Sequence, residues 1–277
     1  MEPSPALSHR LPRDIGATIF GTNIAGYEAA RLGYPGELYE ALHSRCGPEV
    51  GSLLEVGPGT GLATSDLLAT FKPDIYIGVE SDPLLATHLG TAIAASRSVG
   101  TTSVVTGKFE DFETEDRFDL ACSAASFHWL DADRAYANLR QHLRPEGTLA
   151  IWWNCYRQTG IGDPFADHAA PLLAQLPLAP SEGSSGHYSL DVNLHREAMT
   201  GTGFRRFEPH LFRRERILTT EQVVALYASY SYIRALPVAE RYDMLASIAE
   251  LADSRFGGKV PNVVLTALYM ASAPGWE

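Results

Sequence analysis

The feature that most constrains the fold is Leu53–Leu62, "LLEVGPGTGL", in which a short apolar run ends in glycines at alternate positions. The glycines stand at positions 57, 59 and 61, directly after Glu55 and Val56. Glycine adopts backbone conformations that other residues avoid, and it lets the chain lie against a ligand without a Cβ clash. A strand, a glycine-rich turn and a helix in this order place backbone N–H groups beside a ligand site. The stretch therefore predicts a binding loop at the carboxyl end of a strand.

Short apolar runs alternate with helical patterns from about residue 51 to 153, which predicts a parallel sheet covered by helices on both faces. We expect an α/β, Rossmann-like fold in a single domain over residues 1–277. The predicted strands are 52–56, 74–79, 102–106, 118–124 and 146–153, and the predicted helices are 60–70, 83–96 and 131–143.

The chain after Trp153 has a different character, because its first part is rich in Gly, Pro and Ser. Two segments, at about 155–190 and 219–258, are predicted to be inserted and to cap the carboxyl ends of the strands. The charges in 205–218 alternate, which is typical of a strand with one solvated face or an edge position. The predicted helices are 165–176, 191–204, 220–229 and 238–254, and the predicted strands are 205–218 and 263–272.

The composition argues against several classes of protein. The 277 residues include 33 acidic and 22 basic side chains, and a net charge of −11 disfavours nucleic acid as a substrate. The three cysteines form no CxxC pair and the histidines show no ligand spacing, so no metal is expected. No apolar window approaches a membrane span and the first residues lack the core of a signal peptide, so we expect a cytoplasmic protein without membrane contact.

The glycine loop does not follow the dinucleotide spacing G-x-G-x-x-G, because the third glycine is Gly61 and position 62 is leucine. Pro58 removes a backbone donor from the turn, which weakens a pyrophosphate cradle. Glu55 opens the loop and suits a ligand that carries an ammonium group. Glu80 follows the next predicted strand, 23 residues after Gly57, where it can accept hydrogen bonds from ribose hydroxyls.

The next loop, "GKFEDFE", offers Phe109 to lie against a base, and Glu110 or Asp111 to meet its exocyclic amine. Together with Glu55, the glycines and Glu80, these residues describe a site for S-adenosylmethionine. A loop aromatic such as Phe109 is also often a core residue, and Glu55 could instead be a strand-end carboxylate that caps a nearby helix.

The motifs "EVGPGTG", "GVESDP", "GKFEDFE", "SFHWLD" and "LRPEGTLAI" occur in the order of the class I S-adenosylmethionine-dependent methyltransferases. The chain resembles their small-molecule branch, similar to trans-aconitate methyltransferases. The resemblance implies a seven-stranded, mostly parallel sheet of order 3-2-1-4-5-7-6 with the last strand antiparallel. It also implies that Tyr27 and Arg31 close over the methionine carboxylate of the cofactor; the alternative is a surface ion pair with a packing tyrosine. Ala125 and Ser126 stand where relatives often carry Gln-Ala.

Three groups of site residues follow. His128 is the candidate catalytic base, and the alternative is that its ring lines the cofactor pocket. The residues expected to bind S-adenosylmethionine are Tyr27, Arg31, Glu55, Gly57, Gly59, Thr60, Gly61, Glu80, Ser81, Phe109, Glu110, Ser123 and Phe127. Those expected to contact the substrate are Trp129, Trp153, Asn154, Tyr230, Tyr232 and Arg234, although the aromatic residues among them are often core and Asn154 suits an Asx turn.

The aromatic character of these residues predicts a small, aromatic or heteroaromatic methyl acceptor, methylated on C, N or O. The alternatives are methyl esterification of a small carboxylic acid, as in trans-aconitate methyltransferases, and a non-catalytic protein that binds S-adenosylmethionine. A nicotinamide-dependent oxidoreductase is a weaker candidate, because the glycine loop lacks the dinucleotide spacing. A nucleic-acid or protein methyltransferase is also weaker, because the N/D-P-P-Y/F/W motif is missing and the net charge is acidic. We expect a monomer or homodimer.

Overall fold

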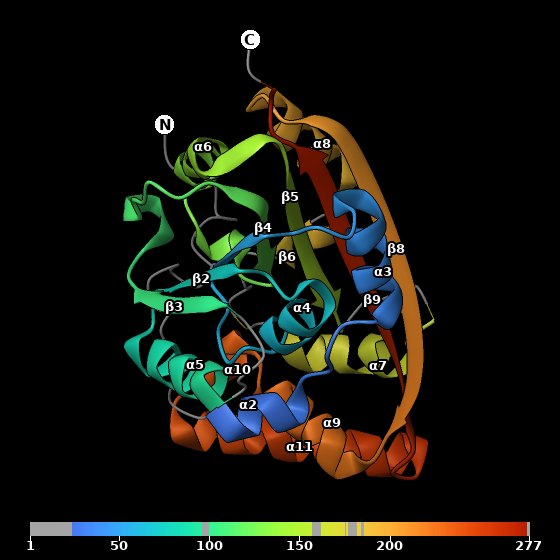
Figure 1. The fold of residues 1–277 in the computed structure, drawn as a ribbon. Coiled ribbons are helices and arrows are strands. Elements are labelled where there is room, and N and C mark those ends of the chain that lie inside the picture. Colours follow the sequence, from blue (N-terminus) through green and yellow to red (C-terminus); the bar gives the residue numbers. More distant parts are fainter. Residues whose placement is uncertain are drawn as a thin grey trace, which may run out of the picture. The chain divides into compact units, whose positions relative to one another are not determined.

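The computed structural model describes residues 24–95, 100–156, 162–174, 176, 182–183 and 186–275 (Figure 1). The chain divides into two compact units. Unit 1 takes its described residues from Met1–Leu32, Asn154–Tyr188 and Arg213–Leu265, and unit 2 takes them from Gly33–Trp153, Ser189–Phe212 and Thr266–Glu277. Each unit is built from segments that are distant in the sequence.

A seven-stranded mixed sheet has the order β3-β2-β1-β4-β5-β9-β8, which confirms the order that the resemblance implied. The pairs β3–β2, β2–β1, β1–β4 and β4–β5 are parallel. The α/β, Rossmann-like fold class is therefore confirmed. The strands are β1 (Ser52–Val56), β2 (Ile75–Glu80), β3 (Thr101–Thr106), β4 (Phe118–Ala124), β5 (Leu143–Cys155), β8 (Arg205–Leu218) and β9 (Val260–Ser272).

Strand β5 shows how unit 2 is layered, because successive side chains of a strand point to opposite faces. Trp152 belongs to the apolar cluster that includes residues of α3 and α4, whereas the ring of Trp153 lies 5.1 Å from that of His195 on α8. The helices of unit 2 are α3 (Gly36–Cys46), α4 (Thr64–Phe71), α5 (Pro83–Ala95), α6 (Ala132–His142) and α8 (Val192–Gly201), with 3₁₀ turns at Phe109–Asp111 and Phe127–Trp129.

Unit 1 is mainly helical. Its elements are α2 (Ile24–Ala30), α7 (Pro164–Leu173), α9 (Thr220–Ala228), α10 (Ser231–Arg234), α11 (Val238–Phe256) and the short pair β6 (Glu182–Gly183) and β7 (Gly186–His187), and a 3₁₀ turn at Tyr188–Leu190 follows β7. The helices α9 and α11 pack against each other, and their buried side chains include Leu226 of α9 and Ile248 of α11. Thr219 and Gln222 form a capping box at the start of α9. The capping of the strand ends by 155–190 and 219–258 stays a prediction.

Helix α4 begins at Thr64, whereas the sequence predicted a helix from residue 60. The glycines at 57, 59 and 61 have φ angles of 63°, 61° and 90°. These angles lie in the left-handed region, which is incompatible with a right-handed helix. Residues 60–63, which the sequence assigned to the helix, therefore belong to the loop.

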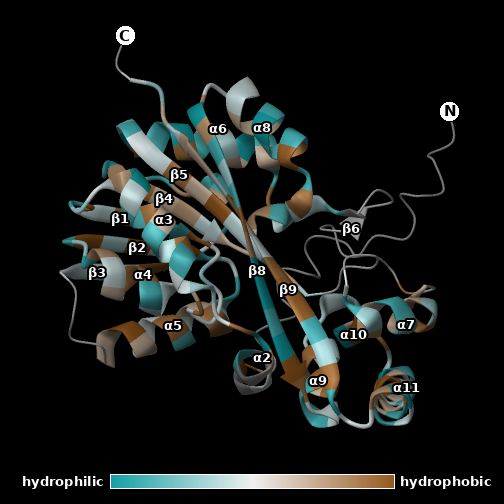
Figure 2. Ribbon diagram, turned by 90° about the vertical axis from the view of Figure 1, so that its right-hand side faces the viewer, coloured by the Kyte–Doolittle hydropathy of each residue, from teal (hydrophilic) through white to brown (hydrophobic). Residues whose placement is uncertain are grey.

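Strand β8 lies at the edge of the sheet, as its charge pattern predicted. Its side chains alternate between exposed and half-buried along most of its length. Figure 2 shows hydrophilic colour along much of β8 and hydrophobic colour along its neighbour β9. Charged side chains on an edge strand disfavour pairing with another chain.

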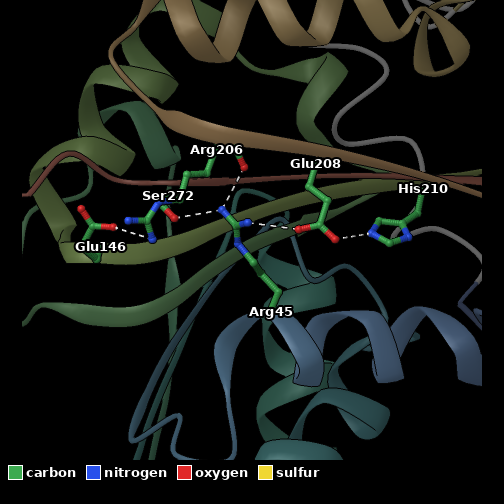
Figure 3. A network of polar contacts seen from close by, with 6 residues as sticks. All are labelled: Arg45, Glu146, Arg206, Glu208, His210 and Ser272. Carbon is green, nitrogen blue, oxygen red and sulfur yellow. Dashed lines mark hydrogen bonds and ion pairs between the residues drawn. The ribbon is translucent and has the colours of Figure 1, made fainter.

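Arg45 of α3 holds the first part of β8 in unit 2 (Figure 3). Its guanidinium donates to Glu208 Oε2 at 3.0 Å, to the backbone oxygen of Arg206 at 2.9 Å and to Ser272 Oγ at 2.9 Å. Glu208 also contacts His210 Nε2 at 2.8 Å. Because the side chain of Arg45 is only 15% exposed, these contacts are better shielded from water than an ordinary surface ion pair.

Replacing Arg45 should therefore destabilise unit 2. We expect Arg45→Gln to lower the free energy of unfolding by about 1–3 kcal/mol, since a half-buried carboxylate and a carbonyl lose charged donors. Chemical denaturation measures the change. The matched control is Arg134→Gln, whose ion pair with Asp111 is 57% and 64% exposed and should contribute much less to stability. Equal effects of the two substitutions would contradict the assignment.

Candidate active site

The glycine loop between β1 and α4 is closed on one side and open on another. Gly57 donates its N–H to the oxygen of Val79 at 2.9 Å, and Gly61 donates to the oxygen of Pro58 at 3.0 Å. A Cβ on Gly57 would lie 2.5 Å from Ser126 Oγ, so only glycine fits there. A Cβ on Gly59 would meet nothing within 4 Å. The loop thus presents open space at Gly59.

Glu80, at the end of β2, is bonded directly to this loop. Its Oε2 accepts the N–H of Gly59 at 2.9 Å, and its Oε1 accepts the N–H of Asp82 at 2.9 Å and the Ser81 hydroxyl at 3.4 Å. Glu80 is 5% exposed. Burial raises the pKa of its carboxyl group, and the N–H donors of Asp82 and Gly59 oppose that rise. The carboxylate and the loop therefore form one preorganised element.

Asp82 is a supporting residue that the sequence analysis did not single out. It is 3% exposed, and its Oδ1 accepts the N–H groups of Leu84 and Leu85 at 2.8 and 3.4 Å. It thereby caps α5, which begins at Pro83. The signal was present in "SDP", because an aspartate directly before a proline is typical of a helix start.

Glu55 supports the loop from the core side. It has no exposed surface, and its Oε2 accepts hydrogen bonds from Thr64 Oγ1 at 2.7 Å and Tyr76 OH at 2.8 Å. Burial raises the pKa of its carboxyl group to about 7, against which these two donors act. This carboxyl group bonds to the side chain of Thr64, the first residue of α4, and among the described residues its Oε1 is buried without a hydrogen-bond partner. Both the helix-capping alternative and the contact with a ligand's ammonium group stay predictions.

The residues of the loop fit a cofactor that offers a hydroxyl or amine group. Thr60 Oγ1 is buried and makes no hydrogen bond. A buried hydroxyl without a partner is costly, so a ligand atom or a water molecule at this point would stabilise it. Gly59 and Thr60 are adjacent in the loop after β1, and Glu80 ends the neighbouring strand β2 and bonds to Gly59. The open space, the hydroxyl and the carboxylate therefore lie on two adjoining segments.

Phe109 and Glu110 follow β3, as predicted, but both are engaged by the protein. Phe109 is 2% exposed, its ring stacks on Phe112 at 6.2 Å, and its backbone oxygen accepts a bond from Asn138 Nδ2 at 2.6 Å. Glu110 Oε1 accepts the N–H of Asp131, the N-cap of α6, at 2.8 Å. This geometry favours the packing interpretation of Phe109, and it gives Glu110 a role in holding α6.

The segment after β4 packs against the glycine loop. Ser126 Oγ donates to the oxygen of Val56 at 2.8 Å and lies 2.7 Å from the hydroxyl of Ser123. Ala125 has a φ of 54°, which is strained for alanine and turns the chain sharply after the strand. Phe127 is 1% exposed and packs against Tyr136. The sequence analysis noted Ser126 only as a departure from relatives and could not show that it faces Gly57.

His128 lies in the 3₁₀ turn that follows. The indole N–H of Trp153 donates to its Nδ1 at 3.0 Å, and its ring lies 4.8 Å from that of Trp129. Trp153 is 2% exposed and is a core residue, whereas Trp129 and His128 are half-buried. Of the predicted substrate residues in unit 2, only Trp129 has appreciable exposed surface.

The remaining predicted residues lie in unit 1. Tyr27 is on α2, and its side chain is outside the described part of the structure. The guanidinium of Arg31 lies 5.0 Å from the ring centres of both Tyr156 and Tyr230 and donates to the oxygen of Ser229 at 3.2 Å. Tyr230 and Tyr232 are 8% and 4% exposed and stack on each other at 5.4 Å, which favours packing, and Arg234 ends α10 and is half-buried.

Asn154 belongs to a polar cluster in unit 1. Its Nδ2 donates to the oxygen of Leu32 at 2.8 Å, and its Oδ1 accepts from Arg214 at 3.3 Å. Arg216, two residues further along β8, donates from Nε to Asn262 Oδ1 at 2.9 Å and lies 5.9 Å from the ring centre of Tyr156. Burial lowers the pKa of Arg216, and only the two tyrosines Tyr156 and Tyr230 oppose that shift.

The sequence analysis missed Arg214 and Arg216. The sequence "RRERIL" predicts that residues two apart, such as Arg214 and Arg216, share a face of the strand. It does not predict which of the two faces is buried.

Two negative findings apply to the described residues alone. In that part of the chain, no three His, Cys, Asp or Glu side chains gather as metal ligands would. Nor does any helix found there have the length and apolar character that crossing a membrane requires.

Comparison with known proteins agrees with this geometry. A model of a methyltransferase domain family matches residues 54–151, which include the glycine loop, Glu80 and the first part of β5. An uncharacterized methyltransferase of Schizosaccharomyces pombe is 28% identical over 242 residues, 86% of this chain and 88% of the relative. The chain carries a class I S-adenosylmethionine-dependent methyltransferase domain.

Two further similarities concern the methyltransferase domain. A trans-aconitate 2-methyltransferase of Deinococcus radiodurans is 30% identical over 103 residues, 36% of each chain. A solved structure from Anaeromyxobacter dehalogenans that carries the name of a type II methyltransferase has a TM-score of 0.61 and 19% identity, covering 89% of this chain and 99% of that one. At this identity the structural similarity supports the fold alone.

The buried carboxyl group of Glu55 should make stability depend on pH. Its pKa is about 7 in the folded protein and has an ordinary value of 4.5, so the folded state keeps a proton that the unfolded state loses between these values. Stability contributed by this group therefore falls as pH rises through that window and is constant above it. We expect the free energy of unfolding of Glu55→Gln, relative to the unsubstituted protein, to rise by up to about 3 kcal/mol from pH 4.5 to 7.

Chemical denaturation at a series of pH values measures this difference. The control is Glu113→Gln, because Glu113 is exposed. The difference in the free energy of unfolding between Glu113→Gln and the unsubstituted protein should not change from pH 4.5 to 7. If the difference in the free energy of unfolding for Glu55→Gln is also constant over this range, folding does not raise the pKa of Glu55.

Proposed function

We propose that the methyltransferase domain binds S-adenosylmethionine at the loop Gly57–Gly61 and at Glu80, and transfers its methyl group to a small molecule. The observation that carries this proposal is the bond between Glu80 Oε2 and the Gly59 N–H, beside the open space at Gly59. A carboxylate fixed there suits the two hydroxyls of a ribose, since ionised acceptors make the stronger hydrogen bonds. Ser81 and the hydroxyl of Thr60 are further contacts on the same two segments.

The bound cofactor supplies a methyl group on a positively charged sulfur, from which an electron-rich acceptor atom can take it directly. The protein's contribution is therefore mainly to position the two molecules and to exclude water. The glycine loop, closed behind by Ser126 and Glu55, is a rigid surface for that purpose. No described residue has to form a covalent bond.

Removing the carboxylate of Glu80 should weaken cofactor binding. We expect Glu80→Ala to raise the Kd for S-adenosylmethionine about tenfold or more, because the ribose contacts and the bond to Gly59 are lost together. Isothermal titration calorimetry measures the change, with circular dichroism to confirm folding. The Kd of Glu80→Gln should lie between those of Glu80→Ala and the unsubstituted protein. Glu113→Ala, at an exposed position, is the control. An unchanged Kd for Glu80→Ala would refute the ribose site.

The acceptor class proposed from the sequence is a small aromatic or heteroaromatic molecule. The half-buried ring of Trp129 beside His128 supports it, since an aromatic face can stack on such a molecule. Trp153, Tyr230 and Tyr232 support it less, because their rings are nearly covered within their own units.

A second candidate is methyl esterification of a small carboxylic acid. The observation that favours it is Arg216, a half-buried cation whose pKa is lowered by burial and whose bonded partner, Asn262, is neutral. A carboxylate beside this guanidinium would recover the solvation that burial removes. The partial similarity to a trans-aconitate 2-methyltransferase points in the same direction.

An acceptor panel separates the two candidates. Phenols, heteroaromatic amines and polycarboxylates are each incubated with radiolabelled S-adenosylmethionine and the purified protein. If carboxylates are acceptors, Arg216→Gln should raise their KM about tenfold or more. The control is Arg213→Gln, which lies on the exposed face of β8 in an ion pair with Glu215. Turnover of aromatic acceptors alone, with no effect of Arg216→Gln, would sustain the first candidate.

Labelled methyl transfer to none of these acceptors, with cofactor binding intact, would favour the non-catalytic alternative. A cytoplasmic location, the lack of nucleic-acid partners and a monomeric or homodimeric state are likewise proposals, which rest on the charge and composition of the sequence.

A further inference from the structure

Trp153 and His128 form a hydrogen bond whose direction is fixed by chemistry. Trp153 is the last residue of β5 within unit 2, and His128 lies in the turn after β4. The indole nitrogen and His128 Nδ1 are 3.0 Å apart. An indole N–H can only donate, so Nδ1 must accept. This histidine nitrogen therefore carries no hydrogen while the bond exists.

The other ring nitrogen follows from this assignment. A neutral imidazole has one hydrogen, so in His128 it is on Nε2, which then acts as a donor. A general base needs a ring nitrogen with a lone pair directed at the acceptor's proton. The one such lone pair of His128 is directed at Trp153, which leaves the ring without a site to take up a proton.

Trp153 is held in this position by aromatic packing. Its ring lies 5.1 Å from His195 and 6.4 Å from Tyr269, and these two rings stack on each other at 4.3 Å. His195 has no exposed surface, and Tyr269 OH donates to the oxygen of Ser189 at 2.7 Å. Turning the indole away from His128 would disturb this packing, which is costly in a dense core.

We propose that Trp153 is a positioning residue that holds His128 in its Nε2–H form, and that His128 donates a hydrogen bond to an oxygen of the methyl acceptor instead of acting as a general base. The inference rests on the proposed methyl transfer and deepens it. It assigns the acceptor to molecules whose reacting oxygen is already ionised at working pH, such as carboxylates and acidic phenols. Such an oxygen needs no proton removed, and an N–H donor orients it.

The tautomer is testable without any activity measurement. In the intact protein labelled with ¹⁵N-histidine, long-range ¹H–¹⁵N spectra distinguish protonated from unprotonated ring nitrogens, and the His128→Gln spectrum assigns the signals. We expect Nδ1 of His128 to be unprotonated and Nε2 protonated at pH 8. Trp153→Phe, checked for folding by circular dichroism, should give a mixture of both forms. A protonated Nδ1 in the unsubstituted protein would overturn the proposal.

Two substitutions of His128 test the donor role. The amide nitrogen of Gln can occupy the place of Nε2, whereas that of Asn lies nearer the place of Nδ1. We expect His128→Gln to keep kcat within about tenfold and His128→Asn to lose about a hundredfold, because only Gln keeps a donor at the place of Nε2. His43→Gln, at an exposed histidine on α3, is the control.

The pH dependence separates the two roles further. With a donor, the profile of kcat/KM for His128→Gln should have the shape of the unsubstituted enzyme. With a base, both substitutions should abolish activity to a similar degree, and the inflection due to histidine should disappear. Binding of S-adenosylmethionine and methyl transfer by the unsubstituted protein are measured as well. Absence of either contradicts the proposed function, whereas a protonated Nδ1 in a protein that binds the cofactor and transfers its methyl group contradicts this inference alone.

Discussion

The hydrogen bond from the Gly59 N–H to Glu80 is the contact on which the candidate site depends. It joins the loop after β1 to the end of β2, and the parallel register, with Val56 beside Val79, brings these two points together. Glu80 is buried, so its carboxylate is stable only because backbone N–H groups of Gly59 and Asp82 solvate it. Gly59 donates from a left-handed conformation, with a φ of 61°, which favours glycine at this position.

Several buried polar groups hold this loop from behind, and each belongs to a different element. Glu55 reaches the start of α4 through Thr64 and reaches β2 through Tyr76. Ser126, after β4, fills the space that a side chain on Gly57 would need. Such hydrogen bonds favour a single arrangement of the loop, because a misplaced member would leave a further buried group without a partner. Rigidity of this kind is what a reaction governed by positioning requires.

The alternation of β5 links the core to the chemistry of the site. Trp152 packs among the helices α3 and α4, and Trp153 points to the other face and bonds to His128. Within unit 1, cations gather near aromatic rings, with Arg31 and Arg216 both close to Tyr156.

The sequence by itself determined the order of the seven sheet strands along the chain, the glycine loop and the positions of Glu80 and His128, because these follow from local periodicity and spacing along a short stretch of chain. It could not determine what Glu55, Phe109 and Trp153 face. Nor could it show that Ser126 closes the loop behind Gly57, or that Arg214 and Arg216 turn inward. Several of those facts depend on pairings between residues far apart in the sequence, such as Trp153 and His128 at 25 positions and Arg214 and Asn154 at 60. Only tertiary packing decides them, because a side chain's partners and burial depend on which distant segments fold beside it.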